Sequence, residues 1–409
     1  MNWDFLIKDK HSLCVSTDTR HLPEGCVFVA LKGEHFNGNH FALQALETGA
    51  AYAIVDEDIP QTCSMKQSYN DRLIRVENAL IALQDLARQW REELGIKVIG
   101  ITGTNGKTTT KELLAAVLKT KYNLLYTQGN LNNQIGVPLT VLSITRDHDL
   151  ALIEMGASHP GDIKELVDIC EPDCGLITNV GKAHLLGFGS FEGVMCTKRE
   201  LYDYLVEHGG TIFRNADNAY LSEMQHQAEH AHKTQTILYN TGSMLHGTHL
   251  VGDYNSENVQ AALCVGEYFG IERSVAEQAI RDYVPANNRS QLLKTKFNTV
   301  VIDAYNANVT SMTAALTAFS GDTVILGDML ELGEYSEAEH EAIVKLLRKR
   351  GFKEVLLVGS EFEKVAGDFA SFADVEALKL YLTTHPLQGR HILLKGSHGI
   401  HLEKVIENI

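Results

Sequence analysis

Positive charge, paired cysteines and long apolar runs are all scarce in this chain of 409 residues. Its 36 Lys and Arg are outnumbered by 52 Asp and Glu, and the formal net charge of -16 argues against nucleic acid or an anionic membrane as the main partner. No stretch approaches the roughly 20 apolar residues of a membrane span, and the first residues are not typical of a signal peptide. We therefore expect no nucleic-acid partner and no membrane partner.

The seven cysteines are scattered and odd in number, which argues against a disulfide framework. Cys170 and Cys174 lie close together, but no second pair completes a zinc site. This usage of cysteine fits a reducing, cytoplasmic location best. At about 150 residues per domain the length predicts two or three domains, and the apolar fraction of 44% is ordinary for globular cores.

The most informative feature that is present is the glycine-rich segment 100–110, which reads Gly-Ile-Thr-Gly-Thr-Asn-Gly-Lys-Thr-Thr-Thr. It lies between a strand-like segment, Lys97-Val98-Ile99, and a segment with high helix propensity at 111–118, so the sequence predicts a strand, a loop and a helix. Such a loop directs backbone N–H groups at one point near the positive end of a helix dipole, where polyphosphate binds. The spacing is a variant, because Ile101 stands where the usual pattern has its first glycine. A chance match in an ordinary turn is the alternative, and the flanking segments disfavour it.

The residue types in this loop predict an ATP site. We expect the Lys107 ammonium to reach the terminal phosphates as a catalytic group and the Thr108 hydroxyl to ligate magnesium. The predicted nucleotide-binding residues of the loop are Gly103, Thr104, Asn105, Gly106, Lys107, Thr108 and Thr109.

Strand-like and helix-like segments divide the chain into three parts. Residues 1–81 contain short strands and a helix, which indicates a small α/β domain. Residues 82–290 predict a central P-loop-type parallel sheet with helices on both faces, because strands such as 150–153 are apolar throughout. Residues 291–409 alternate strands and helices again and predict a C-terminal Rossmann-like, doubly wound domain. The expected fold class is therefore α/β with three domains.

Individual elements follow from the same periodicity. A helix near 336–350 opens with Ser336 and Glu339 in the spacing of a capping box. The loop-like segment 285–289 precedes the last part. In the central part we expect strands near 97–102, 150–155 and 174–180, and helices near 107–121, 190–208 and 255–269.

Polar side chains follow the strands of the central part at the carboxyl edge, where α/β sheets bind ligands. Glu154 ends one strand, and His184 lies in the loop after another. Together with Thr108 they form an oxygen-rich set with one imidazole, which suits Mg²⁺ or Mn²⁺. Each residue alone has an ordinary alternative, Glu154 as a surface or capping carboxylate and His184 as a loop histidine.

Several segments, in this order and spacing, resemble the Mur ligase family, the ATP-dependent ligases that build the peptide of bacterial cell-wall precursors. The resemblance covers nearly the whole chain. The N-terminal runs 16–20 and 30–33 resemble the family's UDP-sugar-binding part. The other matches are the glycine loop, the segment 127–140 (Thr-Gln-Gly-Asn-Leu-Asn-Asn-Gln-Ile-Gly-Val-Pro-Leu-Thr) and the runs 303–308, 326–333 and 394–397.

The resemblance implies an enzyme that uses ATP to convert a carboxylate into an acyl phosphate, which an amine then attacks. The segment 127–140 is most similar to family members that join D-alanyl-D-alanine to UDP-N-acetylmuramoyl-tripeptide, so these are the expected substrates of a monomeric ligase. Two Mg²⁺ ions are expected, one on Thr108 and Glu154 and one near His184, which is also a catalytic candidate.

The resemblance also assigns residues outside the loop. The chain departs from the family pattern at Tyr254, Val309 and His398, where the family has histidine, proline and arginine. His398 cannot offer arginine's permanently charged fork to a carboxylate. The nucleotide-binding residues implied are Asn258, Arg289, Asp303 and Asn306. The substrate-binding residues implied are Ser16, Thr17, Arg20 and Lys32 in the first part, Asn132 and Asn133 in the central part, and Asp328, Lys395 and Ser397 in the last part.

Lys198 matches the position of a family lysine that reacts with carbon dioxide. A carbamate there would turn a cation into an anionic oxygen ligand for a metal, so Lys198 is a further catalytic candidate. Its helical spacing from Val194 and Leu201 allows it to face inward. The alternative is a plain solvated helix lysine beside Glu200 and Asp203.

Two other functions remain open at this point. One is a sibling ligase that adds a single amino acid, either the third residue in the same pathway or glutamate to folate. The segment 127–140 and the runs 303–308 and 326–333 disfavour it. The other is a nucleotide-binding protein without ligase chemistry, such as a regulatory ATPase, in which the UDP-sugar part would have no role.

Overall fold

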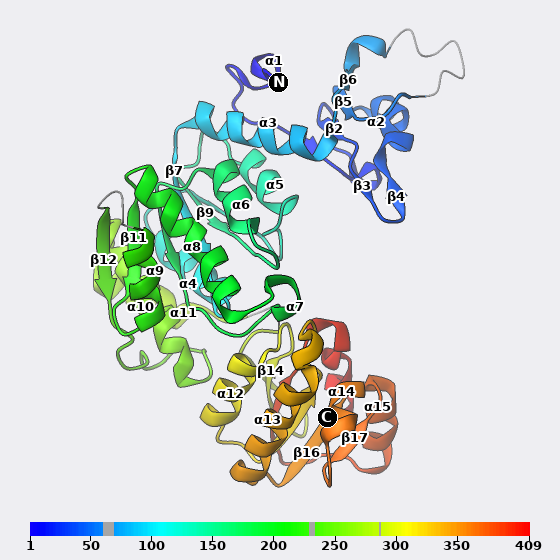
Figure 1. Cartoon of the computed structure of the whole chain (residues 1–409), viewed down its shortest axis with the longest axis vertical. Coiled ribbons are helices and arrows are strands. Elements are labelled where there is room, and N and C mark those ends of the chain that lie inside the picture. Colours follow the sequence, from blue (N-terminus) through cyan, green and yellow to red (C-terminus); the bar gives the residue numbers. More distant parts are fainter. Residues whose placement is uncertain (60–68, 229–233, 286–287) are drawn as a thin grey trace.

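The chain forms an α/β protein whose main sheets follow one another along the molecule (Figure 1). This arrangement confirms the expected fold class, whereas the divisions after residues 81 and 290 stay predictions. No helix in the described part of the chain is long and apolar enough to cross a membrane. The structure, a computed structural model, describes residues 1–59, 69–228, 234–285 and 288–409.

The first sheet consists of short parallel strands with a small core of its own. Helix α2 (Ala42–Thr48) packs against it through residues that include Phe28 and Leu46. An antiparallel ribbon of β3 (Lys32–Gly33) and β4 (Phe36–Asn37) lies between β2 and α2 in the chain. The strand order is β1 (Val15–Ser16), β2 (Val27–Val29), β5 (Tyr52–Val55) and β6 (Leu73–Arg75).

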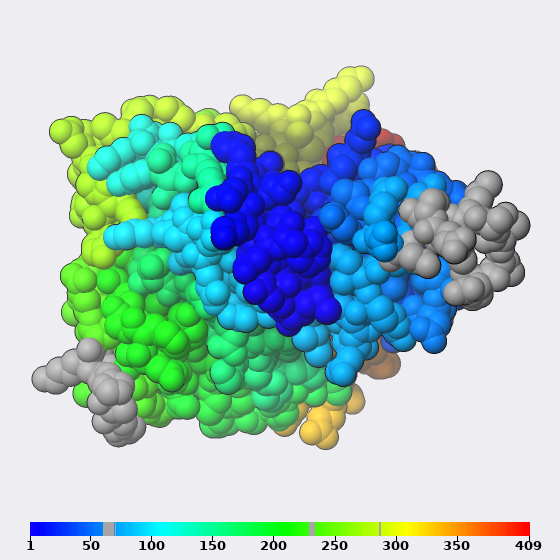
Figure 2. Space-filling view, turned by 90° about the horizontal axis from the view of Figure 1, so that it is seen from above, coloured from blue at the N-terminus to red at the C-terminus, as the bar shows by residue number. Residues whose placement is uncertain are grey.

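Helix α3 (Ala79–Leu94) connects the first sheet to the central one. Asn78 caps it, because its side-chain oxygen accepts hydrogen bonds from two N–H groups of the first turn. The buried face of α3, which includes Leu83, Leu86 and Trp90, belongs to one core shared with β2, β5 and the central sheet. The dark-blue start of the chain, with α1 (Asp4–Ile7), lies across this junction (Figure 2). The first two sheets are therefore joined by continuous apolar packing.

The central sheet has six parallel strands, and alternate residues enter cores on opposite faces. Val98 and Ile153 lie in the core with α3, while Ile99 and Leu152 lie in the core with α4. Burial of both faces explains why these strands are apolar throughout. The strand order is β12 (Gln235–Tyr239), β11 (Thr211–Asn215), β10 (Cys174–Ile177), β7 (Lys97–Thr102), β9 (Leu150–Glu154) and β8 (Leu124–Tyr126).

Helices cover both faces of this sheet (Figure 1). The helices expected near 107–121, 190–208 and 255–269 are confirmed to within a few residues as α4, α8 and α10. One face carries α3, α5 (Gly136–Leu142), α6 (Asp162–Cys170), α8 (Phe191–Glu207) and α9 (Ala219–Ala228). The other carries α4 (Lys107–Leu118), α10 (Ser256–Tyr268) and α11 (Arg273–Asp282).

The last sheet is doubly wound, as the sequence predicts. Its neighbouring strands are parallel except for the pair β13–β14, which is antiparallel. Helices α12 (Val309–Ala318), α13 (Ser336–Arg350) and α14 (Ser360–Val365) pack on one face, and α15 (Val375–Thr384) and η8 (Leu402–Asn408) on the other. The strand order is β13 (Gln291–Lys294), β14 (Thr299–Asp303), β18 (His391–Lys395), β15 (Thr323–Gly327), β16 (Glu354–Val358) and β17 (Ala370–Phe372).

The helix expected near 336–350 is present as α13, but its predicted capping box is wrong. Ser336 is the first helical residue rather than the N-cap. Glu339 instead pairs with Lys182 of the central part, with 3.2 Å between Nζ and Oε1. A capping box does start α12, where Asn308 exchanges hydrogen bonds with the first turn. The spacing of two residue types was insufficient because Tyr335 and Ser336 already have helical backbone angles, and an N-cap residue needs an extended backbone.

Candidate active site

The glycine loop joins β7 to α4, and its glycines are required by both conformation and space. Gly103 (φ 143°) and Gly106 (φ 78°) have backbone angles that favour glycine. A Cβ would lie 2.0 Å from Thr178 Oγ1 at Gly103 and 2.5 Å from Asn258 Oδ1 at Gly106. The unusual glycine spacing is thus matched to the side chains that pack against this loop.

The end of β10 fixes the loop from one side. The N–H groups of Thr104 and Asn105 each donate to an oxygen of Asn179 at 2.9 Å. The Thr178 hydroxyl donates to the backbone oxygen of Asn105 at 2.7 Å. The first N–H groups of α4 follow directly, and those of any helix start lack intrahelical partners. The fixed loop and the helix start therefore form a preorganised anion site.

Lys107 lies at the centre of this loop. Its ammonium donates to the backbone oxygens of Gly103 at 2.8 Å and Thr104 at 3.1 Å. Burial lowers the pKa of Lys107 to about 8, while the Glu154 carboxylate opposes this shift and the Arg289 guanidinium adds to it. The side chain is thus held inside the loop by weak carbonyl contacts that an anionic phosphate can replace.

Glu154 is a buried carboxylate at the carboxyl end of β9. Its Oε1 accepts hydrogen bonds from Thr108 Oγ1 at 3.2 Å and Asn132 Nδ2 at 2.8 Å. The ammonium of Lys111, which is fully buried, lies 3.9 Å from its Oε2. Among the described atoms Oε2 is buried without a hydrogen-bond partner. The surface or capping alternative for Glu154 is therefore excluded, because only 1% of the residue is exposed.

His184 lies in the loop before α7 (Leu185–Phe188) and contacts the last part of the chain. Its Nδ1 pairs with the Glu331 carboxylate. Burial lowers the pKa of His184, and the charge of Glu331 opposes that shift. Both residues have left-handed backbone angles, with φ 50° and φ 64°. Among the described residues, His184 forms no hydrogen bond or ion pair with Thr108 or Glu154, and its role as a metal ligand stays a prediction.

Lys198 is buried within α8, which overturns the alternative of a solvated lysine. Only 2% of it is exposed, and its ammonium lies 5.6 Å from the centre of the Phe188 ring. Burial lowers the pKa of Lys198 well below its usual value, and repulsion by Lys107 adds to the shift. Its neighbour Arg199 instead pairs with Asp203 nearer the surface. Lys198 is therefore buried inside the protein, whereas a direction toward the active site and a role there stay predictions.

The loop, β9, β10 and the last part of the chain enclose one cleft of about 720 Å³. Most of the residues predicted from the sequence line it, although they come from segments far apart in the chain. Gly103, Lys198, Asp328 and Ser397 do not line it, nor do the predicted residues of the first part. The predicted residues that line it are Thr104, Asn105, Gly106, Lys107, Thr108, Thr109, Asn132, Asn133, Glu154, His184, Asn258, Arg289, Asp303, Asn306 and Lys395.

Charged groups from the end of the central part and from the last part close the cleft. The Arg289 guanidinium stacks over Tyr305, 3.8 Å from the ring centre. The buried Lys395 ammonium pairs with Asp303 Oδ2 at 2.5 Å and donates to the backbone oxygen of Asn306 at 3.2 Å. These contacts fix the groups before any ligand arrives.

The two walls of the cleft also bond directly to each other. Asn308 Nδ2 donates to Asn105 Oδ1 at 2.8 Å, so the cap residue of α12 touches the glycine loop. Within the central part, Thr110 of α4 donates a hydrogen bond to Asn258 of α10 at 2.9 Å. Both contacts lie beside the positions where a polyphosphate would bind.

Asp328 and Ser397 have structural partners that the sequence did not reveal. The Asp328 carboxylate accepts hydrogen bonds from the N–H groups of Glu361 at 2.9 Å and Phe362 at 2.8 Å, and so caps α14. Ser397 Oγ accepts from the N–H of Leu330 at 3.0 Å. Their contact with a substrate stays a prediction.

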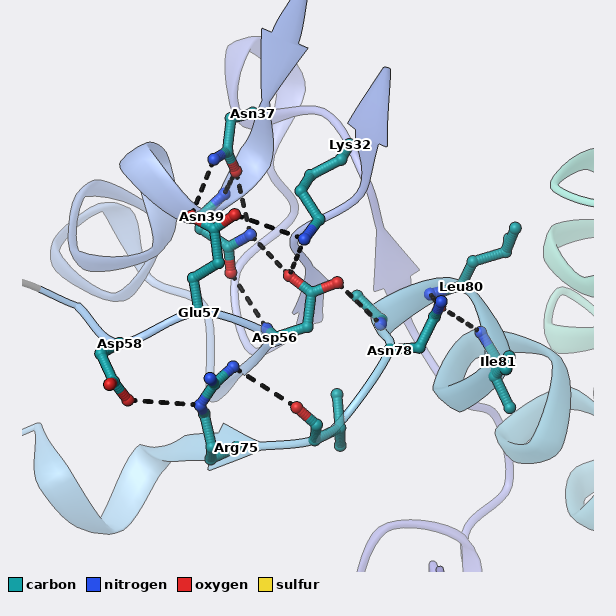
Figure 3. Close-up of polar contacts among 12 residues, drawn as sticks. Lys32, Asn37, Asn39, Asp56, Glu57, Asp58, Arg75, Asn78, Leu80 and Ile81 are labelled. Atoms are coloured by element: carbon teal, nitrogen blue, oxygen red, sulfur yellow. Dashed lines mark hydrogen bonds and ion pairs between the residues drawn. The ribbon is translucent and has the colours of Figure 1, made fainter. Parts of the chain in front are cut away.

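Lys32 of the first part belongs to a polar network at the end of β5 (Figure 3). Its ammonium lies 3.1 Å from Asp56 Oδ1 and 3.3 Å from Glu57 Oε1. Asp56 also accepts from Asn39 Nδ2 at 2.8 Å and from the N–H of Ala79 at 3.2 Å. The network therefore links the position of Lys32 to the start of α3.

The other predicted residues of the first part gather around Asp18. Arg20 pairs with Asp18 at 2.7 Å, and the Ser16 hydroxyl donates to the Asp18 backbone oxygen at 3.0 Å. Thr17 lies between them in the chain. Their role in binding a UDP-sugar stays a prediction.

The parallel sheets, the phosphate-binding loop and the two-walled cleft define a nucleotide-dependent α/β enzyme of several domains. Family models agree with this class. The Mur ligase catalytic domain matches residues 13–91, the Mur ligase middle domain 101–245, and the Mur ligase glutamate ligase domain 288–398. The chain belongs to the Mur ligase family, which confirms the resemblance seen in the sequence.

Individual relatives are similar over nearly their full length. The UDP-N-acetylmuramoyl-tripeptide–D-alanyl-D-alanine ligase of Bacillus subtilis is 34% identical, with 97% of this chain and 92% of the relative covered. The ligase of the same name from Escherichia coli is also 34% identical, with 96% of this chain and 92% of the relative covered.

Solved structures give the same result. A crystal structure of MurF from Acinetobacter baumannii has a TM-score of 0.85 at 28% identity, covering 96% of this chain and 92% of that one. The MurF ligase of Thermotoga maritima, solved with ADP, has a TM-score of 0.83 at 27% identity and covers 98% of both chains.

Several residues that shape the site were missed from the sequence. Lys111 looks like an ordinary helix lysine, yet it is fully buried beside Glu154 and donates to the backbone oxygen of Thr127 at 2.8 Å. Tyr305 and Glu331 lie in recognised segments, but only the fold brings them to Arg289 and His184. The helical spacing of Lys111 within the apolar face of α4 was the one available signal.

Proposed function

We propose that this chain is an ATP-dependent carboxylate–amine ligase that joins D-alanyl-D-alanine to UDP-N-acetylmuramoyl-tripeptide, forming ADP and phosphate. The observation that carries the proposal is the full-length similarity to ligases of that name. The phosphate-binding loop and the cleft between the central and last parts supply the chemistry that such a reaction needs. The proposal places the reaction in cytoplasmic synthesis of peptidoglycan precursors.

The reaction consists of a phosphoryl transfer to a carboxylate oxygen and then an acyl transfer to an amine. A carboxylate oxygen of the tripeptide attacks the γ-phosphorus, ADP leaves, and an acyl phosphate forms. The amine of the dipeptide then attacks the acyl carbon, and phosphate leaves with one former carboxylate oxygen. The protein contributes mainly positioning and charge neutralisation, for which the loop, Lys107 and Arg289 are placed.

Thr108 and Glu154 fit a Mg²⁺ site. A buried carboxylate oxygen without a hydrogen-bond partner, next to a hydroxyl at the phosphate loop, is the donor set that a hard cation prefers. A bound Mg²⁺ would neutralise phosphate charge there. The proposal assigns a second ion to the neighbourhood of His184, where the oxygens of the acyl phosphate would be its main ligands.

Replacing Glu154 by glutamine should raise the Mg²⁺ concentration needed for half-maximal turnover by at least about 10-fold, because losing even a group that only supports a metal ligand typically costs about 10- to 100-fold. The amide keeps the shape and can still accept from Thr108 and Asn132, but it removes the anionic oxygen. Turnover as a function of Mg²⁺ measures the effect. The matched control is Glu112→Gln, because Glu112 also contacts Lys111, at 2.9 Å, yet does not line the cleft. Equal Mg²⁺ dependence in both variants would contradict the assignment.

Lys198 is proposed to act as a carbamate. Burial lowers the pKa of the Lys198 amine, which favours the neutral form, and the neutral form is the one that adds carbon dioxide. The product would be an anion in place of an amine. The charge of Lys107 acts on the pKa of Lys198, and the charge of Lys198 acts on the pKa of His184, so the anion would lie near both side chains. The carbamate would supply an anionic oxygen with which a metal ion can pair.

The proposal distributes the substrates over the three parts. Lys32, Ser16, Thr17 and Arg20 are assigned to the UDP-sugar. Asn132 and Asn133, on the cleft wall below the loop, are assigned to the tripeptide. The dipeptide is assigned to the last part near Lys395, Ser397 and Asp328, with Lys395 the one that lines the cleft.

The test is the dependence of ADP formation on the two peptide substrates. Rapid ADP release is expected only when the tripeptide nucleotide and D-alanyl-D-alanine are both present, together with a product of their combined mass less water. Release with single amino acids in place of the dipeptide would favour the sibling ligase. Release that ignores both substrates would favour an ATPase of another kind.

A further inference from the structure

Three potential metal ligands converge after the last strand, outside the site described above. His398, His401 and Glu403 each present a donor atom, and these atoms all lie within 4.8 Å of one another. His398 lies in the short helix η7 (His398–Ile400), and Glu403 lies in η8. His401 links the two with a left-handed backbone, φ 59° and ψ 39°, which turns the chain between them.

The three side chains are already arranged around one another. The His398 and His401 rings meet edge to face with centres 5.5 Å apart. Glu403 Oε1 lies 3.3 Å from His401 Nδ1. Its other oxygen, Oε2, is buried and has no hydrogen-bond partner among the described atoms. A buried carboxylate oxygen without a donor is unfavourable, and one oxygen of this carboxylate lies within 4.8 Å of a nitrogen of each imidazole.

We propose that His398, His401 and Glu403 bind one divalent transition-metal ion of the zinc class. Two imidazole nitrogens and one carboxylate oxygen are a common donor set for Zn²⁺, with a fourth position left for water or another ligand. Bonds of roughly 2.0–2.2 Å to a tetrahedral ion require donor atoms about 3.5 Å apart. Small side-chain rotations bring atoms within 4.8 Å to that spacing.

The donor set distinguishes this site from the one proposed for Mg²⁺. Magnesium prefers oxygen ligands in an octahedral arrangement and binds imidazole poorly. The pair Thr108 and Glu154 offers oxygen only, whereas this cluster offers mainly nitrogen. The two sites should therefore select different ions from a mixture.

The cluster lies next to the cleft without lining it. The His398 ring stacks on Tyr305 with centres 5.4 Å apart and an angle of 16°, and the Arg289 guanidinium covers Tyr305 as well. Tyr305 and Arg289 line the cleft, but the three ligands do not. A bound ion would fix the His398 ring and, through it, the positions of Tyr305 and Arg289 at the edge of the cleft. The metal site does not rest on the proposed ligase function.

The test uses the full-length protein without a histidine tag, stripped of metal with a chelator. Calorimetric titration with Zn²⁺, carried out in excess Mg²⁺, should show that each chain binds one Zn²⁺ ion. The variants His398→Ala and Glu403→Gln should each weaken that site at least 10-fold. Co²⁺ should bind to the same site and give a visible absorption band of tetrahedral type, which both variants lose.

The matched control is His385→Ala. His385 is also an exposed histidine of the last part stacked on a tyrosine, with its ring 4.2 Å from that of Tyr381, but it lies outside the cluster. This variant should bind Zn²⁺ like the wild type. Melting temperatures without metal identify any variant that fails to fold, and Zn²⁺ should raise that of the wild type and of His385→Ala but not those of the cluster variants.

Two results would overturn the proposal. One is a wild-type protein that does not bind Zn²⁺ at micromolar concentration. The other is binding that remains equally strong in folded His398→Ala and Glu403→Gln, since the ion would then occupy other histidines of the chain.

Discussion

Replacing Lys107 by alanine is expected to lower ligase turnover by roughly 10²–10³-fold at saturating ATP, the range for removing one preorganised charge-stabilising donor. Its ammonium lies inside the glycine loop, where it now donates to the Gly103 and Thr104 oxygens. Those contacts are weaker than a charge-assisted bond to phosphate, so the ammonium should exchange them as negative charge develops. Steady-state turnover with both peptide substrates measures the loss.

The fold should survive this change, because the loop is held mainly by Thr178 and Asn179. The matched control is Lys119→Ala, an exposed lysine just after the end of the same helix. It should turn over like the wild type and melt at a similar temperature. Near-normal turnover in Lys107→Ala would mean that the nucleotide binds elsewhere.

Lys198→Ala is the second variant for which we expect a large loss, about 100-fold in turnover, if a carbamate positions a metal. Added bicarbonate cannot restore it, because no amine remains to react. A short carboxylic acid in the buffer should restore part of the activity, since it can enter the vacated space and supply the missing oxygens. Turnover with and without acetate or formate measures both effects.

The neighbouring variant Arg199→Ala provides the control, because Arg199 lies on the same helix but pairs with Asp203 instead of pointing inward. It should lose little activity and show no response to acid. Carbon NMR of wild-type protein equilibrated with labelled bicarbonate should reveal a carbamate signal that Lys198→Ala lacks. A fully active Lys198→Ala, or a wild type without that signal, would rule out the carbamate.

The glycine loop and the doubly wound sheets could be predicted because their signals are local. Apolar strands buried on both faces and a helix start after glycines depend on neighbouring residues alone. The strand-end residues Glu154 and His184 could be found for a related reason, since parallel strands bring their carboxyl ends to one edge. Glu154 meets Thr108 there, but His184 pairs with Glu331 across the cleft.

Other parts of the site depend on contacts between distant segments and could not be predicted. Lys111 is buried because the surrounding strands and Glu154 offer it partners, which its sequence neighbours do not indicate. Asp328 belongs to a recognised run, yet its oxygens cap α14 some thirty residues later in the chain. Glu339 was expected in a capping box, but it pairs with Lys182 of the central part instead. Local residue types constrain such partners only weakly.

The most direct test of the acyl phosphate mechanism traces a carboxylate oxygen of the tripeptide into the released phosphate. The tripeptide nucleotide is labelled with heavy oxygen in the carboxylate that receives the dipeptide, and the reaction is run with ATP and D-alanyl-D-alanine. Attack of that carboxylate on the γ-phosphorus predicts one labelled oxygen in the released phosphate for every dipeptide joined. Mass spectrometry of phosphate and product measures both quantities. Unlabelled phosphate, or ADP formed without the joined product, would contradict the acyl phosphate and with it the proposed ligase.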